Sequence, residues 1–165
     1  MNSMETVQQR ETALKIKTIL VAVDLSSHSE RTVAYAVPIA RQFGASLKVI
    51  HVYAPPNGTE FGAQDMCRLL EKDRDDVERS LASLVDRVRA EYPRCESILR
   101  TGDVPEQIAS AASLTGANLI VVGRHHQTFL GRILNLDQAP KIVQRVACPV
   151  LVCEDEDNRQ EEAAI

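Results

Sequence analysis

The chain has 165 residues and a formal net charge of −4, with 44% hydrophobic and 25% charged residues, a composition typical of one soluble globular domain. A domain of this size buries enough apolar surface to be stable without a metal ion or a disulfide. Aromatic residues make up only 4% of the chain and no basic stripe is present, which argues against nucleic-acid binding. Because residues 1–15 contain no long apolar run, we expect no signal peptide, no membrane partner and a cytoplasmic protein.

Two short apolar runs rich in β-branched residues predict buried central strands at residues 18–23 and 118–122. Runs of this kind are typical of strands in a parallel sheet that is covered on both faces. Three weaker runs predict further strands at residues 46–52, 95–99 and 149–153.

A helical pattern fills the gap after the first strand. Ser27 and Glu30 have the spacing of a capping box, which predicts the start of this helix, and Gly44 has the position of a glycine that ends it. Pro38 lies inside the pattern and should kink the helix, because proline removes one backbone hydrogen bond.

Three further helices are predicted at about residues 64–91, 104–115 and 138–147. Strands that alternate with helices at this spacing indicate right-handed crossovers and an α/β fold with a doubly wound, five-stranded parallel sheet. We expect one domain at residues 16–154, between a flexible N-terminal tail and an acidic C-terminal tail at residues 155–165.

In a sheet of this type, ligands bind beyond the carboxyl ends of the strands. Asp24, Val52, Gly102 and Gly123 end or follow the first four predicted strands and are therefore candidate binding residues. Asp24 is open to two interpretations at this point, a functional carboxylate or a cap for the turn after the first strand.

Four segments resemble the universal stress protein family: ILVAVD at 19–24, GD at 102–103, LIVVG at 119–123 and ACPVLV at 147–152. The match covers residues 17–153, with the segments in the family's order and spacing. The resemblance implies a Rossmann-like fold, similar to that of adenine-nucleotide alpha-hydrolases, with strand order 3-2-1-4-5. It also implies a homodimer that commonly pairs through the last strand.

Many members of this family bind ATP through a loop that reads G-x2-G-x9-G-(S/T), in which glycines let the backbone approach the phosphates. Here Gly123 keeps the first position, but His126, Leu136 and Asp137 occupy the other three. Aspartate is a strong helix cap, and its charge would repel a phosphate charge ~4 Å away by roughly 4 kcal/mol at an effective dielectric near 20. We therefore predict that this chain does not bind ATP in the family manner.

An alternative prediction is a remodelled anion site that still binds ATP or AMP. Arg124, His125 and His126 could supply cationic contacts to phosphate. Asp24 and Val52 match positions that hold the adenosine moiety in ATP-binding relatives. The two adjacent histidines do not predict a metal site, because neighbouring loop residues rarely converge on one ion and no cysteine or carboxylate cluster accompanies them.

No catalytic motif is present. Ser26 and Ser27 follow the first strand, but no nucleophile elbow and no accompanying histidine indicate acyl transfer. The histidines at positions 28 and 51 are expected to be structural or surface residues. We predict a protein without enzymatic activity that acts in the stress response, as a homodimer and with an unidentified protein partner.

The last predicted strand supplies a local reason for dimerisation. Val150, Leu151, Val152 and Cys153 should form an apolar edge of the sheet, which is prone to aggregate unless it is paired. Pairing with a second copy across a two-fold axis would cover it, so we predict a dimer interface at these residues. The cysteines at positions 67, 95, 148 and 153 show no C-x-x-C spacing and are predicted to be buried or half-buried reduced thiols.

Overall fold

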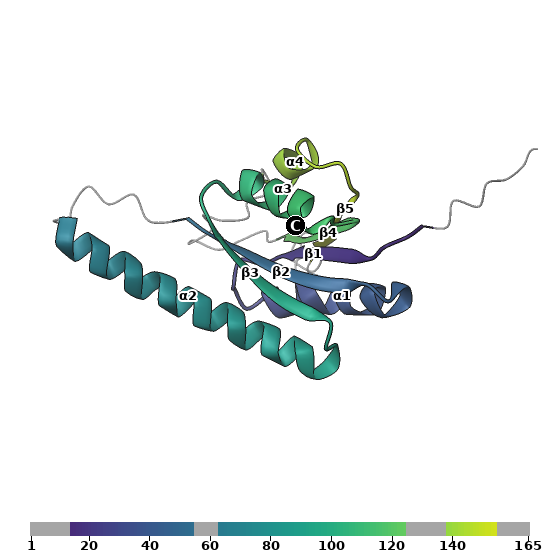
Figure 1. Ribbon diagram of the computed structural model, residues 1–165, viewed down its shortest axis with the longest axis horizontal. Helices are drawn as coiled ribbons and strands as arrows, with labels where there is room; N and C mark the ends of the chain where they lie inside the picture. The colour runs from purple at the N-terminus through teal and green to yellow at the C-terminus, as the bar shows by residue number, and fades with distance from the viewer. Residues whose placement is uncertain (1–13, 55–62, 125–137, 155–165) are drawn as a thin grey trace, which may run out of the picture.

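A computed structural model of the chain describes residues 14–54, 63–124 and 138–154, and only the backbone of residues 63–70, 124, 138 and 154 (Figure 1). These residues form a five-stranded parallel sheet in the order β3-β2-β1-β4-β5, so the predicted fold class and strand order are confirmed. The strands are β1 (Thr18–Ala22), β2 (Ser46–Tyr53), β3 (Cys95–Thr101), β4 (Leu119–Arg124) and β5 (Val150–Glu154).

Four helices of the described part of the chain cover the two faces of this sheet. They are α1 (Ser29–Phe43), α2 (Ala63–Glu91), α3 (Val104–Thr115) and α4 (Gln138–Val143). Figure 1 shows α1 and α2 on one face and α3 and α4 on the other. None of the helices in the described part of the chain combines the length and the apolar character needed to span a membrane.

The core consists of two layers that meet at the central strand. Ile19 and Val21 of β1 face α1 and α2, whereas Leu20 faces α3 and α4, and all three side chains are fully buried. Because side chains alternate along a strand, a run that is apolar at every position fits only a strand covered on both faces. The apolar stripe of α1 at residues 33, 36, 37 and 40 is likewise buried.

Glycines end two of the helices as predicted. Gly44 follows α1 and Gly116 follows α3, each with φ of 63° in the left-handed region that favours glycine. At its other end α3 is capped by Asp103, whose carboxylate accepts a hydrogen bond from the backbone N–H of Glu106 at 3.2 Å. The predicted carboxyl-terminal ends of α1 and α3 are therefore confirmed, whereas the cap by Asp103 was not predicted.

The predicted capping box at the start of the first helix was wrong. The helix begins at Ser29, and His28 has the N-cap position without a side-chain capping bond. Asp24 orders this turn in place of Ser27: its Oδ1 accepts hydrogen bonds from the Ser26 backbone N–H at 2.9 Å and from the Ser29 hydroxyl at 3.0 Å. A carboxylate at the end of β1 reaches both donors, which the Ser27–Glu30 spacing alone does not reveal.

The last helix is shorter than predicted, ending at Val143 rather than near residue 147. The Arg145 N–H donates to the carbonyl of Ile142 at 2.9 Å, a tight turn that leaves the helix. Pro149 then precedes β5, and a proline disfavours helical backbone at the residue before it. Residues 144–149 therefore serve to bring the chain to the edge of the sheet.

Candidate functional site

The strand order brings together four of the predicted site residues at the carboxyl edge of the sheet. β1 lies between β2 and β4, and Ala22 is aligned with Ile50 and with Val122. Asp24, two residues further on, therefore lies at the level of Val52 on one side and of β4's end on the other. Gly102 follows β3 and Gly123 lies within β4, on the same edge. His126, Leu136 and Asp137 lie outside the described residues, as does the side chain of Arg124.

Asp24 has a structural task at this edge. Its side chain is half-buried, and its two hydrogen bonds to Ser26 and Ser29 hold the loop between β1 and α1. Leu25, the next residue, has φ of 61°, which a non-glycine residue rarely adopts. The carboxylate thus stabilises a turn with strained backbone, and its proposed contact with a ligand remains a prediction.

Gly123 is required by the packing of α1 against β4. A Cβ built on Gly123 would lie 2.3 Å from the hydroxyl oxygen of Thr32 and 3.5 Å from that residue's Cβ. Thr32 is only 5% exposed, and its hydroxyl donates to the His28 carbonyl at 3.4 Å, so it has little room to move. Packing against Thr32 is therefore sufficient to explain why this chain keeps a glycine at the first position of the family loop, and no bound phosphate is needed to explain it.

Gly102 and Val52 are also tied to the fold. Gly102 has φ of 135°, and its N–H donates to the Tyr53 carbonyl at 3.1 Å, which joins the end of β3 to that of β2. Val52 is 3% exposed and packs in the core layer beneath α3 and α4. Its side chain is consequently part of the core of the domain.

His51 is a buried structural histidine, in agreement with the first of the two roles expected for it. It is 3% exposed, and its Nδ1 lies 2.9 Å from the carbonyl oxygen of Val23, where a protonated Nδ1 donates a hydrogen bond. Burial lowers the pKa of His51 below its ordinary value, against smaller opposing effects of that hydrogen bond and of Asp24. The neutral ring therefore joins β2 to the end of β1.

Tyr53 links the sheet edge to α2, a contact that the sequence analysis did not find. Its hydroxyl donates to a carboxylate oxygen of Asp73 at 2.8 Å. Burial, followed by this carboxylate, raises the pKa of Tyr53 to about 12. Because Asp73 belongs to a dense charged run on α2, the sequence offers no signal that singles it out.

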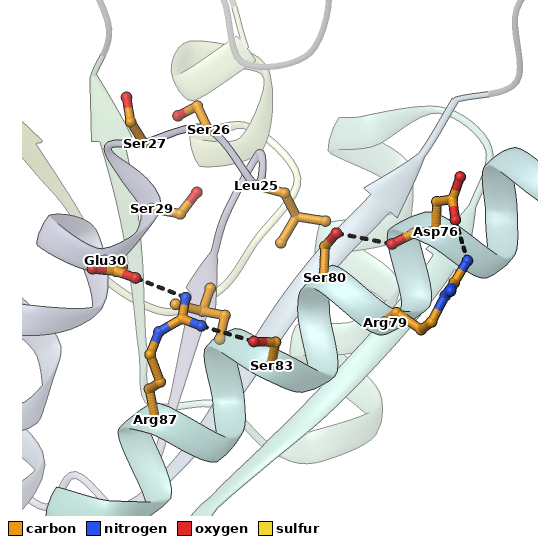
Figure 2. Close-up of a pocket in the computed structure, with 11 residues that line it drawn as sticks. Leu25, Ser26, Ser27, Ser29, Glu30, Asp76, Arg79, Ser80, Ser83 and Arg87 are labelled. Atoms are coloured by element: carbon orange, nitrogen blue, oxygen red, sulfur yellow. Dashed lines mark hydrogen bonds and ion pairs between the residues drawn. The ribbon is translucent and has the colours of Figure 1, made fainter.

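A pocket of about 760 Å³ lies between the β1–α1 loop and the middle of α2 (Figure 2). Its walls are rich in hydroxyl and charged groups, and the lining residues are Leu25, Ser26, Ser27, Ser29, Glu30, Asp76, Arg79, Ser80, Ser83, Leu84 and Arg87. Sequence reasoning missed it because the two walls are some fifty residues apart in the chain. Only the packing of α2 beside α1 brings them together.

Both arginines of this pocket are paired. Arg87 contacts Glu30 at 2.7 Å and donates to the Ser83 hydroxyl at 2.8 Å, while Arg79 pairs with Asp76 (Figure 2). Two cations and two anions leave no net charge to attract a phosphate group. The pocket suits a neutral polar group better than an anion.

The described residues contain no cluster of three or more histidine, cysteine, aspartate or glutamate side chains that could hold a metal ion. Cys95 and Cys153 are buried and Cys148 is half-buried, all as free thiols, whereas the side chain of Cys67 lies outside the described residues. Burial raises the pKa of Cys95 to about 11, which keeps this thiol protonated and unreactive near neutral pH.

Comparison with known proteins identifies the family. The universal stress protein family model matches residues 15–154. A universal stress protein of Thermus aquaticus is 34% identical over 145 residues, covering 82% of this chain and 97% of that protein. A solved universal stress protein from Archaeoglobus fulgidus is 25% identical with a TM-score of 0.64, covering 82% of this chain and 97% of its own.

A second solved structure, of a universal stress protein in complex with cAMP, is 25% identical with a TM-score of 0.62 and covers 83% of this chain and 96% of its own. The residues matched by the family model include all the described strands and helices. The chain belongs to the universal stress protein family.

Proposed function

We propose that this chain is a dimeric, non-catalytic stress-response protein that does not bind ATP through the family's glycine loop. The observation that carries this proposal is the replacement of three of the four loop positions, by His126, Leu136 and Asp137. A leucine in place of glycine hinders close approach of the backbone to a ligand, and the aspartate repels an incoming phosphate.

Three contacts at the carboxyl edge support this proposal. Gly123 is accounted for by its packing against Thr32, so its retention is no sign of a phosphate site. One oxygen of the Asp24 carboxylate already holds the β1–α1 loop. The two arginines of the adjacent pocket are paired with carboxylates and offer no free cation to a triphosphate.

Calorimetric titration with ATP tests the proposal. We expect no micromolar affinity in the natural chain, and a gain of at least tenfold, or about 1.4 kcal/mol, in a variant carrying His126→Gly, Leu136→Gly and Asp137→Ser, which restores the loop pattern. Asp137→Asn alone is the matched control, because it removes the charge but keeps the leucine, and it should recover only part of the gain. Micromolar ATP binding by the natural chain would contradict the proposal.

A second candidate function is binding of an adenine nucleotide that carries a single phosphate. The related protein solved with cAMP favours it, because that ligand makes fewer demands on a phosphate loop than a triphosphate does. In this chain Asp24 and Val52 lie at the carboxyl edge of the sheet, where ligands bind in folds of this type. Titration with AMP and with cAMP distinguishes the candidates: affinity for either that is weakened by Asp24→Asn, with none for ATP, supports the second.

The proposed dimer forms through the outer strand β5. Leu151 is 38% exposed and Val152 41% exposed, although both are large apolar residues, and β5 ends the sheet among the described strands. Pairing of two β5 strands about a two-fold axis would cover these side chains and satisfy the edge backbone groups. Sedimentation at micromolar concentration should give the mass of two chains.

The absence of a catalytic role is the remaining part of the proposal. The hydroxyls beside Asp24 serve the loop: Ser29 donates to Asp24, and Ser26 accepts from the backbone N–H of His28 at 3.3 Å. His51 is too deeply buried to exchange protons with a ligand. Ser29 and Asp24 do place a hydroxyl within hydrogen-bond reach of a carboxylate, but Ser29 is only 3% exposed, so its hydroxyl is not accessible to a substrate.

A further inference from the structure

A second pocket, of about 560 Å³, lies at the opposite, amino end of the sheet. The end of α3, the turn after α4 and the start of β5 form its walls, and the lining residues are Lys15, Ala109, Ala112, Ser113, Gly116, Ala117, Asn118, Arg145, Val146, Ala147, Cys148 and Pro149. Two of these residues are cationic and none is a carboxylate. Unlike the charge-balanced pocket at the other end of the sheet, this pocket is lined by cations without carboxylates.

Neither cation of this pocket is neutralised by a described residue. Within the described part of the chain, Lys15 forms no ion pair and Arg145 makes only a long contact of 3.5 Å to the carbonyl of Lys141. The carboxyl ends of α3 and α4 lie nearby, and each contributes at most about half a negative charge. Two full positive charges exceed that, so the pocket carries a net positive charge and would favour an acidic group.

The chain itself contains an acidic segment of suitable length. Residues 155–165 directly follow β5 and include five carboxylates, three of them consecutive at Asp155, Glu156 and Asp157, against the single cation Arg159. Eleven residues can span up to about 36 Å when extended. Charge and reach both make this segment a candidate occupant of the basic pocket.

The proposed dimer determines which copy supplies the segment. Two β5 strands that pair over all five residues about a two-fold axis run antiparallel and are centred on Val152, so the partner's Glu154 lies opposite Val150. If the partner's chain continues in the same direction, its next residues pass Pro149 and Cys148, which line the pocket. Within one chain the segment starts at the far end of β5, about 13 Å from Val150.

We propose that the acidic residues 155–157 of one copy bind the pocket formed by Lys15 and Arg145 of the other copy. This inference rests on the proposed dimer. It gives each dimer two symmetric contacts in which a carboxylate of one chain meets a cation of the other. Such exposed pairs are weak singly and are screened by salt, so the contact should adjust dimer strength and should not create the dimer.

Carbodiimide cross-linking of reassembled dimers tests the proposal, because this reagent joins a carboxylate to an amine only where the two are in contact. Dimers are formed from a mixture of unlabelled (light) and ¹⁵N-labelled (heavy) chains. They are cross-linked in about 50 mM and in about 500 mM NaCl, because the higher salt concentration screens the attraction between exposed charges much more strongly. We expect peptide pairs joining Lys15 to residues 155–157 with one light and one heavy member, several-fold fewer at the higher salt concentration.

Two variants make the test specific. Arg145→Gln keeps the Lys15 amine but removes half of the pocket's charge, and should reduce the Lys15 links several-fold. Arg94→Gln is the matched control, because Arg94 is a cation at the same end of the sheet that donates to the Gly44 carbonyl at 2.8 Å and does not line the pocket. It should leave the yield unchanged. Deletion of residues 155–165 should weaken dimerisation about tenfold at low salt only.

Sedimentation of the same samples before cross-linking separates the two proposals. A dimer whose Lys15 links are absent, or join residues of the same chain only, overturns the docking of the acidic segment and leaves the dimer intact. A monomer overturns both. Equal link yields in the Arg145→Gln and Arg94→Gln variants would also overturn the pocket assignment, because the charge of Arg145 would then have no part in it.

Discussion

The two outer strands of the sheet have equivalent positions but opposite surface chemistry. On β3, Glu96, Ser97 and Arg100 are exposed, Lys48 of the neighbouring strand pairs with Glu96 at 2.5 Å, and the long helix α2 runs alongside (Figure 1). The Lys48 ammonium lowers the pKa of Glu96, which keeps this carboxylate charged. On β5 the exposed side chains are the apolar Leu151 and Val152.

Charged side chains on an edge strand prevent it from pairing with another sheet, whereas an apolar edge without them is open to pairing. The comparison therefore indicates that β3 closes the sheet and that β5 is available to a second copy.

The largest expected effect follows from placing a charge on the β5 edge. In a symmetric pairing centred on Val152, the two copies of this residue are opposite each other, so Val152→Lys would set two like charges side by side. We expect the dissociation constant of the dimer to rise at least about 100-fold, or roughly 2.7 kcal/mol, measured by sedimentation equilibrium.

The same charge on the other edge is the control for that experiment. Ser97→Lys adds a lysine to an exposed position of β3 that already has charged neighbours, and it should leave dimerisation unchanged. Weakening by both variants, or by neither, would contradict the distinction between the two edges.

A smaller effect is expected where the β4–β5 half of the sheet meets α1. Gly123→Ala places a methyl group against the Thr32 hydroxyl and should lower the free energy of unfolding by about 1–3 kcal/mol. Combining it with Thr32→Ala should remove most of that loss, whereas combining it with Thr32→Ser, which keeps the hydroxyl, should not. Urea unfolding of the single and double variants measures the coupling. Identical losses in both backgrounds would show that this contact does not explain the glycine.

The smallest effect concerns β2, which connects the charged edge to the centre of the sheet. Burial lowers the pKa of His51 from its ordinary value of 6.5. As the pH falls below about 6.5, His51 is therefore protonated in the unfolded chain before it is protonated in the folded chain. Stability is therefore full above this pH and decreases below it, by at most about 1.4 kcal/mol per pH unit for one group.

Urea unfolding between about pH 7.5 and pH 5 measures this dependence. His51→Gln keeps a side-chain donor for the Val23 carbonyl but cannot titrate, so it should flatten the pH dependence in this window even if it lowers stability overall. Equal slopes for the natural chain and the variant would show that His51 is not the responsible group.

Features that depend on a few neighbouring residues were predictable from the sequence. The apolar runs at residues 18–23 and 118–122 predicted the strands that the structure has at Thr18–Ala22 and Leu119–Arg124, and the helix ends at Gly44 and Gly116 follow from glycines after a helical pattern. The altered glycine loop, and with it the ATP prediction, also comes from the sequence alone, since positions 126, 136 and 137 lie outside the described residues. These signals are local, so no knowledge of tertiary packing is needed to interpret them.

Tertiary structure decided what depends on residues far apart in the chain. Only the order of the strands and the packing of the helices reveal that the Thr32 side chain leaves no room for a Cβ at position 123. The same is true of the hydrogen bond from Tyr53 to Asp73 and of the pocket that Lys15 and Arg145 share. The sequence could identify a glycine, a tyrosine or a lysine at each place but not its neighbour, because contact is set by the crossovers between strands. Those crossovers place the charge-balanced pocket and the pocket lined by Lys15 and Arg145 at opposite ends of one sheet.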